Sequence, residues 1–134
     1  ALRVASLLRV TGELEDIGDC CHRLVQLAHR KYRKNRVLPQ ETLREIKVFS
    51  EQILDFMELY QTHLKDGSVP DIEKAQVIED RIDASRKSLR KNAVKRMQDK
   101  ESLKAEMIYI DILNEMESIG NDALNVVQAL NHVI

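Results

Sequence analysis

Apolar residues recur along this chain in alternating steps of three and four, the spacing that gathers them on one face of an α-helix. The pattern holds in four segments and stops where helix-breaking residues occur. Pro39 marks the first interruption, and the stretch KDGSVPD, residues 65–71, marks the second. We therefore predict four long helices, over residues 2–34, 39–65, 72–98 and 103–132.

The connections between these segments are short, so each helix is expected to lie antiparallel to the next. Helices of about 30 residues are about 45 Å long at a rise of about 1.5 Å per residue. The expected fold is thus all-α, an elongated antiparallel up-down four-helix bundle. The length of 134 residues suits one domain, which we place over residues 1–134.

The first segment has one apolar stripe that we expect to face the core. Its members are Leu7, Val10, Leu14, Ile17, Cys21, Leu24 and Ala28. The neighbouring stripe of the same helix contains Glu15 and Gly18. A carboxylate at the edge of an apolar face needs an ion-pair partner, a hydrogen bond or a metal ion, because its burial alone is costly.

The first and last segments are related by a shift of 102 positions, as from Glu15 to Glu117. Six residues recur unchanged after this shift: Glu13, Glu15, Ile17, Gly18, Val25 and Gln26. Coiled-coil periodicity would align apolar residues, but it does not account for the repeated Glu and Gly. We therefore predict an internal repeat, in which Glu117 and Gly120 form the second copy of the element.

The bulk composition narrows the function classes. The net charge of -1 provides no overall basic field to attract nucleic acid. Cys20 and Cys21 are adjacent, a geometry that disfavours a disulfide and indicates a reducing compartment. The one basic run, RKYRKNR at residues 30–36, falls where the first helix should end and complements its dipole. Contact with a membrane surface or an acidic partner is the alternative for this run.

Three pairs of oxygen donors have the i, i+4 spacing that places both side chains on one face of a helix. The pairs are Glu15 with Asp19, Glu79 with Asp83, and Glu117 with Asn121. Such pairs on two packed helices can surround a hard cation. For Glu79 and Asp83, a surface ion-paired with Arg86 or Arg90 is an equally weighted alternative.

Three short motifs of the chain resemble those of the PhoU family. LEDIGD, residues 14–19, is similar to that family's Leu-Glu-Arg-Ile-Gly-Asp signature, and MESIGN, residues 116–121, is similar to its second copy. IEDRID, residues 78–83, resembles the acidic segment of the preceding helix. The first helical segment looks closest to the PhoU-like domain that follows the membrane part of many bacterial sodium/phosphate cotransporters.

The resemblance implies that the chain binds a metal through its Glu/Asp-x-x-x-Asp motifs. The implied ligands are Glu15, Asp19, Glu79, Asp83, Glu117 and Asn121. They would hold a divalent or ferric cation, and all-oxygen ligation favours the harder ions. Asn121 stands where the family has Asp, so the second copy has lost a charge. We predict no catalytic residue, no small-molecule substrate and no enzymatic activity.

The resemblance also implies a cytoplasmic regulator of phosphate transport or phosphate signalling, located at the inner face of the plasma membrane of a bacterium. The expected partner is the membrane transporter portion of the same or an associated protein, and no nucleic acid. A full domain of this family has six helices, so we expect a fragment of a longer chain. An open apolar flank on its first helix would favour a homodimer. The alternatives are a metal-free interaction or scaffold bundle and a carboxylate-bridged metalloenzyme.

Overall fold

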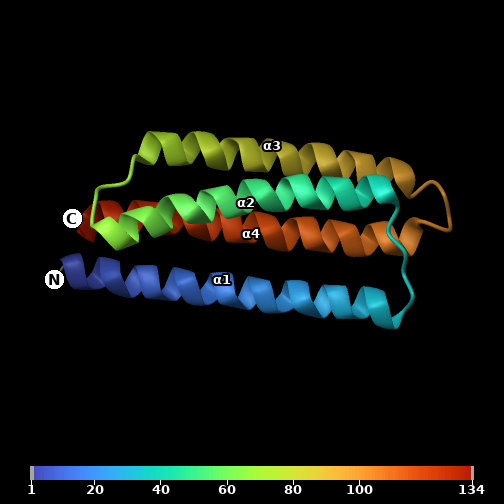
Figure 1. Ribbon diagram of the computed structural model, residues 1–134, viewed down its shortest axis with the longest axis horizontal. Helices are drawn as coiled ribbons and strands as arrows, with labels where there is room; N and C mark the ends of the chain where they lie inside the picture. Colours follow the sequence, from blue (N-terminus) through green and yellow to red (C-terminus); the bar gives the residue numbers. More distant parts are fainter. Residues whose placement is uncertain (1, 134) are drawn as a thin grey trace.

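The structure, a computed structural model, describes residues 2–133 and consists of four helices and their connections (Figure 1). The helices are α1 (Leu2–Arg33), α2 (Gln40–Asp66), α3 (Ile72–Arg96) and α4 (Leu103–Val133). No strand occurs among the described residues, so the all-helical prediction is confirmed. Between Leu2 and Val133, no helix has both the length and the apolar content that crossing a lipid bilayer requires.

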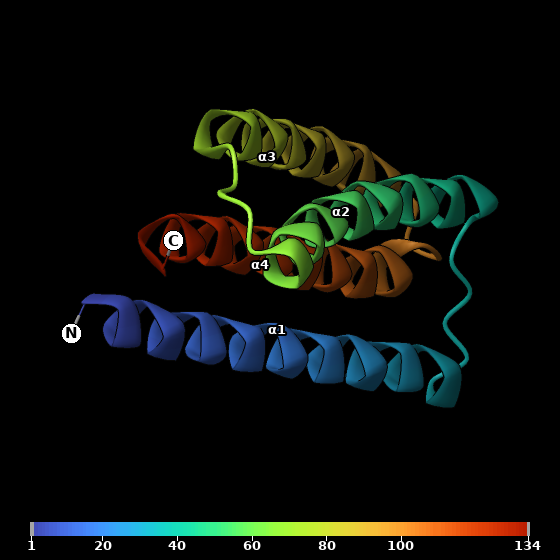
Figure 2. The ribbon, with the colours of Figure 1, turned by 60° about the vertical axis from the view of Figure 1, so that its left-hand side comes forward.

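Helix α4 lies at the centre of the arrangement (Figure 1, Figure 2). α1 lies on one side of it, α2 and α3 lie on the other, and successive helices run in alternating directions along one long axis. α2 and α3 contact α4 and each other, whereas α1 contacts α4 alone among the described helices. The molecule is therefore a three-helix group, α2 to α4, with α1 attached along one side, rather than four helices closed around a single core.

Local residues set the ends of α2 and α3 as the sequence indicates. Gly67 ends α2 in the left-handed conformation, at a φ of 69°, and its N–H donates to the His63 carbonyl at 3.0 Å. Asp71 begins α3 by accepting a hydrogen bond from the Lys74 N–H at 3.1 Å. The turn between α2 and α3 thus has a defined stop and a defined start.

The buried face of α1 is rotated relative to the predicted stripe. From Val10 onward, its buried or half-buried residues are Val10, Glu13, Ile17, Cys20, Leu24, Leu27 and Lys31. The prediction was wrong for Leu7, Leu14, Cys21 and Ala28, whose side chains are exposed. α1 packs against a single helix, so only a narrow seam is covered, and the flank that carries Cys20 and Leu27 is the one facing α4.

The main core lies between α4 and the hairpin of α2 and α3. Its largest fully buried side chains include Phe49 and Phe56 of α2, Ile82 of α3, and Tyr109 and Leu113 of α4. Burying one such side chain stabilises the fold by about 1.5–3 kcal/mol. This core holds α3 and α4 in a fixed register, and that register decides which carboxylates of the two helices lie close together.

Candidate functional site

The first predicted ligand pair, Glu15 and Asp19, lies on exposed surface of α1. α1 contacts no helix other than α4 among the described residues, and both carboxylates lie outside the seam between them. No second helix of residues 2–133 therefore adds ligands to this pair. A cation site here would need oxygen donors from a partner molecule or from water.

The other predicted ligands lie where α3 packs on α4. The positively charged side chain of an arginine already lies between two of these carboxylates. Arg86 of α3 forms an ion pair with Glu117 of α4, and its guanidinium also lies 3.7 Å from Asp83. Lys87 reaches the other oxygen of Asp83 at 3.1 Å. Asn121 is exposed. The arrangement is an ion-pair network, in which Arg86 supplies the positive charge that a metal would otherwise supply.

Glu79 of α3 lies deeper than this network, against the repeated glycine of α4. Its side chain is buried, and its Oε2 lies 3.2 Å from the position that a Cβ on Gly120 would occupy. Ile53 of α2 closes the same spot, so the absence of a side chain at Gly120 allows all three helices to approach. Gly18, the repeat partner on α1, has open space around it.

Burial changes the protonation of Glu79. Its Oε2 has no hydrogen-bond partner among the described residues. Burial raises the pKa of Glu79 to about 7, and the neighbouring carboxylates of Asp83 and Asp80 contribute to the same shift. Glu79 is therefore a proton-binding group near neutral pH rather than a permanently charged one.

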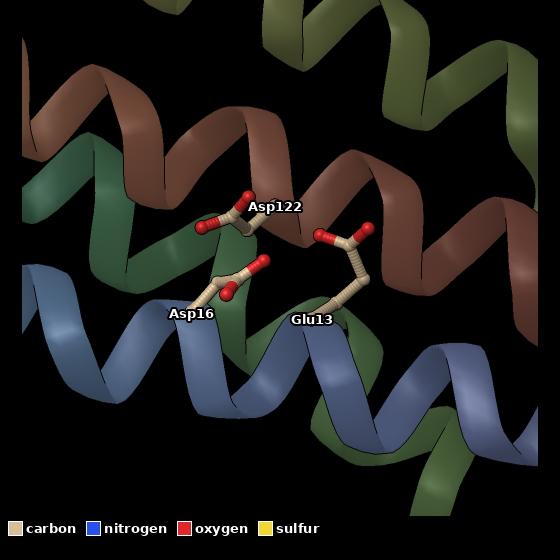
Figure 3. Close-up of side chains that lie close together, drawn as sticks. All are labelled: Glu13, Asp16 and Asp122. Atoms are coloured by element: carbon tan, nitrogen blue, oxygen red, sulfur yellow. The ribbon is translucent and has the colours of Figure 1, made fainter.

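A third group of carboxylates, which the ligand prediction did not include, forms where α1 meets α4. Glu13 and Asp16 extend from α1 and Asp122 extends from α4 toward them (Figure 3). Each residue places a carboxylate oxygen within 4.8 Å of the others. The Asn125 side-chain amide donates to Glu13 at 3.3 Å. We call these three residues the α1–α4 carboxylate cluster.

The three carboxylates are close enough together to hold one hard cation. The pKa of Asp122 is raised to about 6. Burial is the largest cause, the hydrogen bond to Glu13 and the charges of Glu13 and Asp16 add to the shift, and Arg23 opposes it. Protonation of Asp122 relieves part of the repulsion at low pH. Above that range, a divalent cation held by the three carboxylates would relieve it instead.

The rotation of α1 and α4 about their own axes explains why the ligand prediction did not include the α1–α4 carboxylate cluster. Glu13 was noted as a repeated residue, but the predicted stripe on α1 omitted it from the seam facing α4. Asp122 lies next to Asn121, about 100° further round the helix. This turn directs Asp122 to α1, while Asn121 stays exposed.

Substituting Asp122 by Asn is expected to have opposite effects without and with a divalent cation. Without the ion, at about pH 8, the variant should be more stable than the wild type, because one of three repelling charges is gone. With Mn²⁺, the wild type should gain about 2.7 kcal/mol when the free ion is about 100 times its dissociation constant, and the variant should gain much less. Thermal unfolding with and without the ion measures both effects.

Asp111→Asn, an exposed substitution on the same helix, is the control and should respond to Mn²⁺ as the wild type does. The stabilisation of the wild type by Mn²⁺ should be smaller at about pH 5, where Asp122 is protonated. An unchanged Mn²⁺ response in Asp122→Asn would show that the cluster is not the site.

The sequence analysis also missed a buried polar network at the opposite end of the α3–α4 pair. Glu106 is fully buried and accepts hydrogen bonds from Thr42 at 2.9 Å and from the Arg96 Nε at 2.8 Å. Arg96 also donates to Glu45 at 2.6 Å, and its guanidinium lies 5.6 Å from the centre of the Tyr109 ring. The network joins α2, α3 and α4 and is structural, since every charge in it is paired.

Comparison of the chain with known protein families, with characterised proteins and with solved structures finds no match. No relative therefore assigns a ligand or a partner to these carboxylates.

Proposed function

We propose that the chain is a regulatory helical domain of the PhoU type that acts by binding partner helices rather than by catalysis. Its role would be to regulate phosphate transport or phosphate signalling at the inner face of a bacterial plasma membrane, as the soluble tail of a sodium/phosphate cotransporter. The resemblance of LEDIGD, MESIGN and IEDRID to the motifs of that family supports this role.

The observation that carries the proposal is the contrast between the two copies of the repeat. Leu7 of α1 is 45% exposed, whereas its repeat partner Tyr109 on α4 is fully buried. Val25 is 66% exposed, and its partner Val127 is fully buried. The sequence thus repeats an apolar face that is covered on α4 and uncovered on α1. We call the uncovered one the α1 outer face, which comprises Val4, Leu7, Leu8, Leu14 and Val25.

The copy of the repeat on α4 is covered by other helices, and its contacts indicate what kind of partner would fit the uncovered copy on α1. On α4, Glu117 pairs with an Arg of the covering helix, and Gly120 allows that helix to approach closely. On α1, the equivalent Glu15 and Gly18 are exposed, with no neighbour at the glycine. A partner should therefore present apolar helices and a basic side chain opposite Glu15.

Two occupants of the α1 outer face agree with this chemistry: helices of the membrane transporter portion, and a second copy of the chain in a homodimer. Metal binding by the predicted Glu and Asp ligands would modulate the contact. The ion pairs of Arg86 with Glu117 and Asp83 favour one alternative, a metal-free scaffold bundle in which these acidic residues are structural.

The test is a Leu8→Glu/Val25→Glu variant in a bacterium that carries the gene. Both side chains are exposed, so the fold should be retained while charge is added to the α1 outer face. We expect the variant to lose most of the change in radiolabelled phosphate uptake that follows a change in external phosphate. Size-exclusion chromatography with light scattering, run on the purified chains, reports whether a dimer is lost as well.

The matched control is Leu54→Glu/Val77→Glu, which adds the same charge at exposed apolar positions of α2 and α3. It should keep normal regulation. A dimer that is lost only in the α1 variant would identify the second copy as the occupant, and an unchanged monomer would indicate the transporter. Normal phosphate regulation in both variants would contradict the proposed function.

A further inference from the structure

The charges of the chain are separated along the long axis of the molecule, although they nearly cancel in total. Residues 20–36 contain six Arg and Lys and no Asp or Glu, and residues 84–98 contain six Arg and Lys and no Asp or Glu. In contrast, residues 13–19 contain four acidic residues and no basic one. Residues 66–83 contain six acidic residues and two basic ones.

The fold brings the two basic segments to one end. Figure 1 shows that α1 and α3 run in the same direction and that both finish at the end where the α1–α2 connection lies. The ion pairs of Arg96 with Glu45 and Glu106 fix the end of α3 beside the start of α2. Residues 66–83 comprise the α2–α3 connection at the other end and the first half of α3, and residues 13–19 lie near the middle of α1. The molecule is therefore a rod with a basic end and an acidic end.

The α1–α2 corner at the basic end has a defined shape. Asn35 adopts a left-handed φ of 52°, and the Arg36 N–H donates to the Lys31 carbonyl at 2.9 Å. This closure is the Schellman turn that ends a helix. Leu38 is buried directly after it and anchors the connection in the core.

This anchored corner presents two apolar side chains among its cations. Tyr32 is 82% exposed and Val37 is 83% exposed, the highest values among the exposed large hydrophobic residues of the described chain. Arg33 and Lys34 are exposed beside them, and no salt bridge among residues 2–133 engages either one or Arg36. Exposed cations that flank an aromatic and an aliphatic side chain are typical of surfaces that bind the lipid–water interface.

α3 carries a second group of basic residues in the half of the helix that finishes at the same end of the molecule. A hollow of about 580 Å³ along this helix is lined by Arg86, Lys87, Arg90, Lys91, Val94 and Lys95. Arg90, Lys91 and Lys95 are exposed. The basic surface therefore has contributions from two helices and is not explained by the dipole of α1 alone.

We propose that the basic end of the molecule, centred on the α1–α2 corner, docks on an anionic lipid bilayer. Arg33, Lys34 and Arg36 would contact the phosphate headgroups, while Tyr32 and Val37 enter the interface. A flat anionic surface attracts one end of the rod and repels the acidic end, so the charge separation also sets the orientation. Val37 has no role in base stacking, and a nucleic acid long enough to reach the acidic half would be repelled there.

This inference does not rest on the proposed function, because pure lipid vesicles contain no transporter and the corner lies outside the α1 outer face. The test is flotation of the whole chain with vesicles of phosphatidylcholine alone or mixed with phosphatidylglycerol. We expect binding to the mixed vesicles only, weakening as salt is added. The Arg33→Gln/Lys34→Gln/Arg36→Gln variant should bind about 100-fold more weakly, since each cation near such a surface contributes about 1 kcal/mol.

The matched control is Arg3→Gln/Lys65→Gln/Lys74→Gln, which removes three exposed cations from the other end and reaches the same net charge. It should bind the mixed vesicles as the wild type does. The Tyr32→Ser/Val37→Ser variant should bind them several-fold more weakly. Circular dichroism confirms that all variants remain helical. An equal loss in both triple variants would overturn the proposal, and so would the absence of binding to anionic vesicles. Displacement of the chain from the vesicles by inorganic phosphate at constant ionic strength would also overturn the proposal, because it would indicate a site for a free phosphate ion.

Discussion

Replacing Arg96 by Met is expected to lower the free energy of unfolding by about 3–5 kcal/mol, the usual cost of removing one partner of a buried ion pair. Glu106 is fully buried, and Arg96 provides its only cationic partner within the described residues. Burial disfavours the charged form of Arg96, but its bonds to Glu45 and Glu106 outweigh that effect and raise its pKa. The substitution would leave a buried carboxylate held by the Thr42 hydroxyl alone.

Urea unfolding measures the loss, with Arg90→Met as the control. Arg90 is an exposed cation of the same helix, and its substitution should change stability by less than about 0.5 kcal/mol. The double variant Arg96→Met/Glu106→Leu should recover part of the stability, because the buried carboxylate is removed together with its cation, although Glu45 still loses its ion-pair partner. A loss below about 1 kcal/mol in Arg96→Met would show that Glu106 remains solvated in solution.

The second large effect expected is a dependence of stability on pH that disappears in Glu79→Gln. The pKa of Glu79 is raised from an ordinary value of 4.5 to about 7 in the folded chain. The folded state thus binds a proton that the unfolded state has already released, so stability is highest below the ordinary pKa and falls as pH rises through 7. A shift of this size corresponds to a loss of about 3 kcal/mol at most.

Wild type and Glu79→Gln should therefore be similarly stable at about pH 5, where the Glu79 side chain is neutral in the folded wild type. At about pH 8, the variant should be more stable by up to about 3 kcal/mol. The difference between the two proteins is the informative quantity, because Asp122 contributes a slope of the same sign to both. Glu73→Gln, an exposed substitution on the same helix, should follow the wild type. An equal difference at both pH values would contradict a buried, titrating Glu79.

The helices and their ends could be predicted because the signals are local. Three-four spacing identifies an amphipathic helix wherever it packs, and Gly67 ends a helix whatever surrounds it. The orientation of α1 could not be predicted in the same way. Its apolar residues cover more than one flank, and only the position of α4 decides that Cys20 rather than Cys21 is buried. This one rotation also brings Glu13 to Asp122.

The carboxylates were the least predictable part, because spacing along one helix does not report what lies opposite. Asp83 and Glu117 each belong to an i, i+4 pair with the spacing of metal ligands. The structure places the Arg86 side chain between these two carboxylates. Glu106 lies in the first turn of α4, yet it is buried against Arg96. The partner of a carboxylate that lies between helices comes from another helix, which spacing along one helix cannot identify. Metal binding by the six predicted ligands stays a prediction.

The attachment of α1 to a single neighbour has a consequence for folding. α3 and α4 meet through contacts as close in sequence as Arg96 and Glu106, whereas α1 reaches α4 through pairs such as Arg23 with Glu115, 92 residues apart. Closing the longer loop costs more chain entropy, so the α2–α4 group should assemble first and α1 should dock last. The same seam is where the native chain should open at the lowest free energy. Its release would uncover a second apolar side of α4, including Ile108 and Ile112, which form one buried cluster with Leu27 of α1. A partner bound across α1 and α4 would therefore also stabilise the native fold.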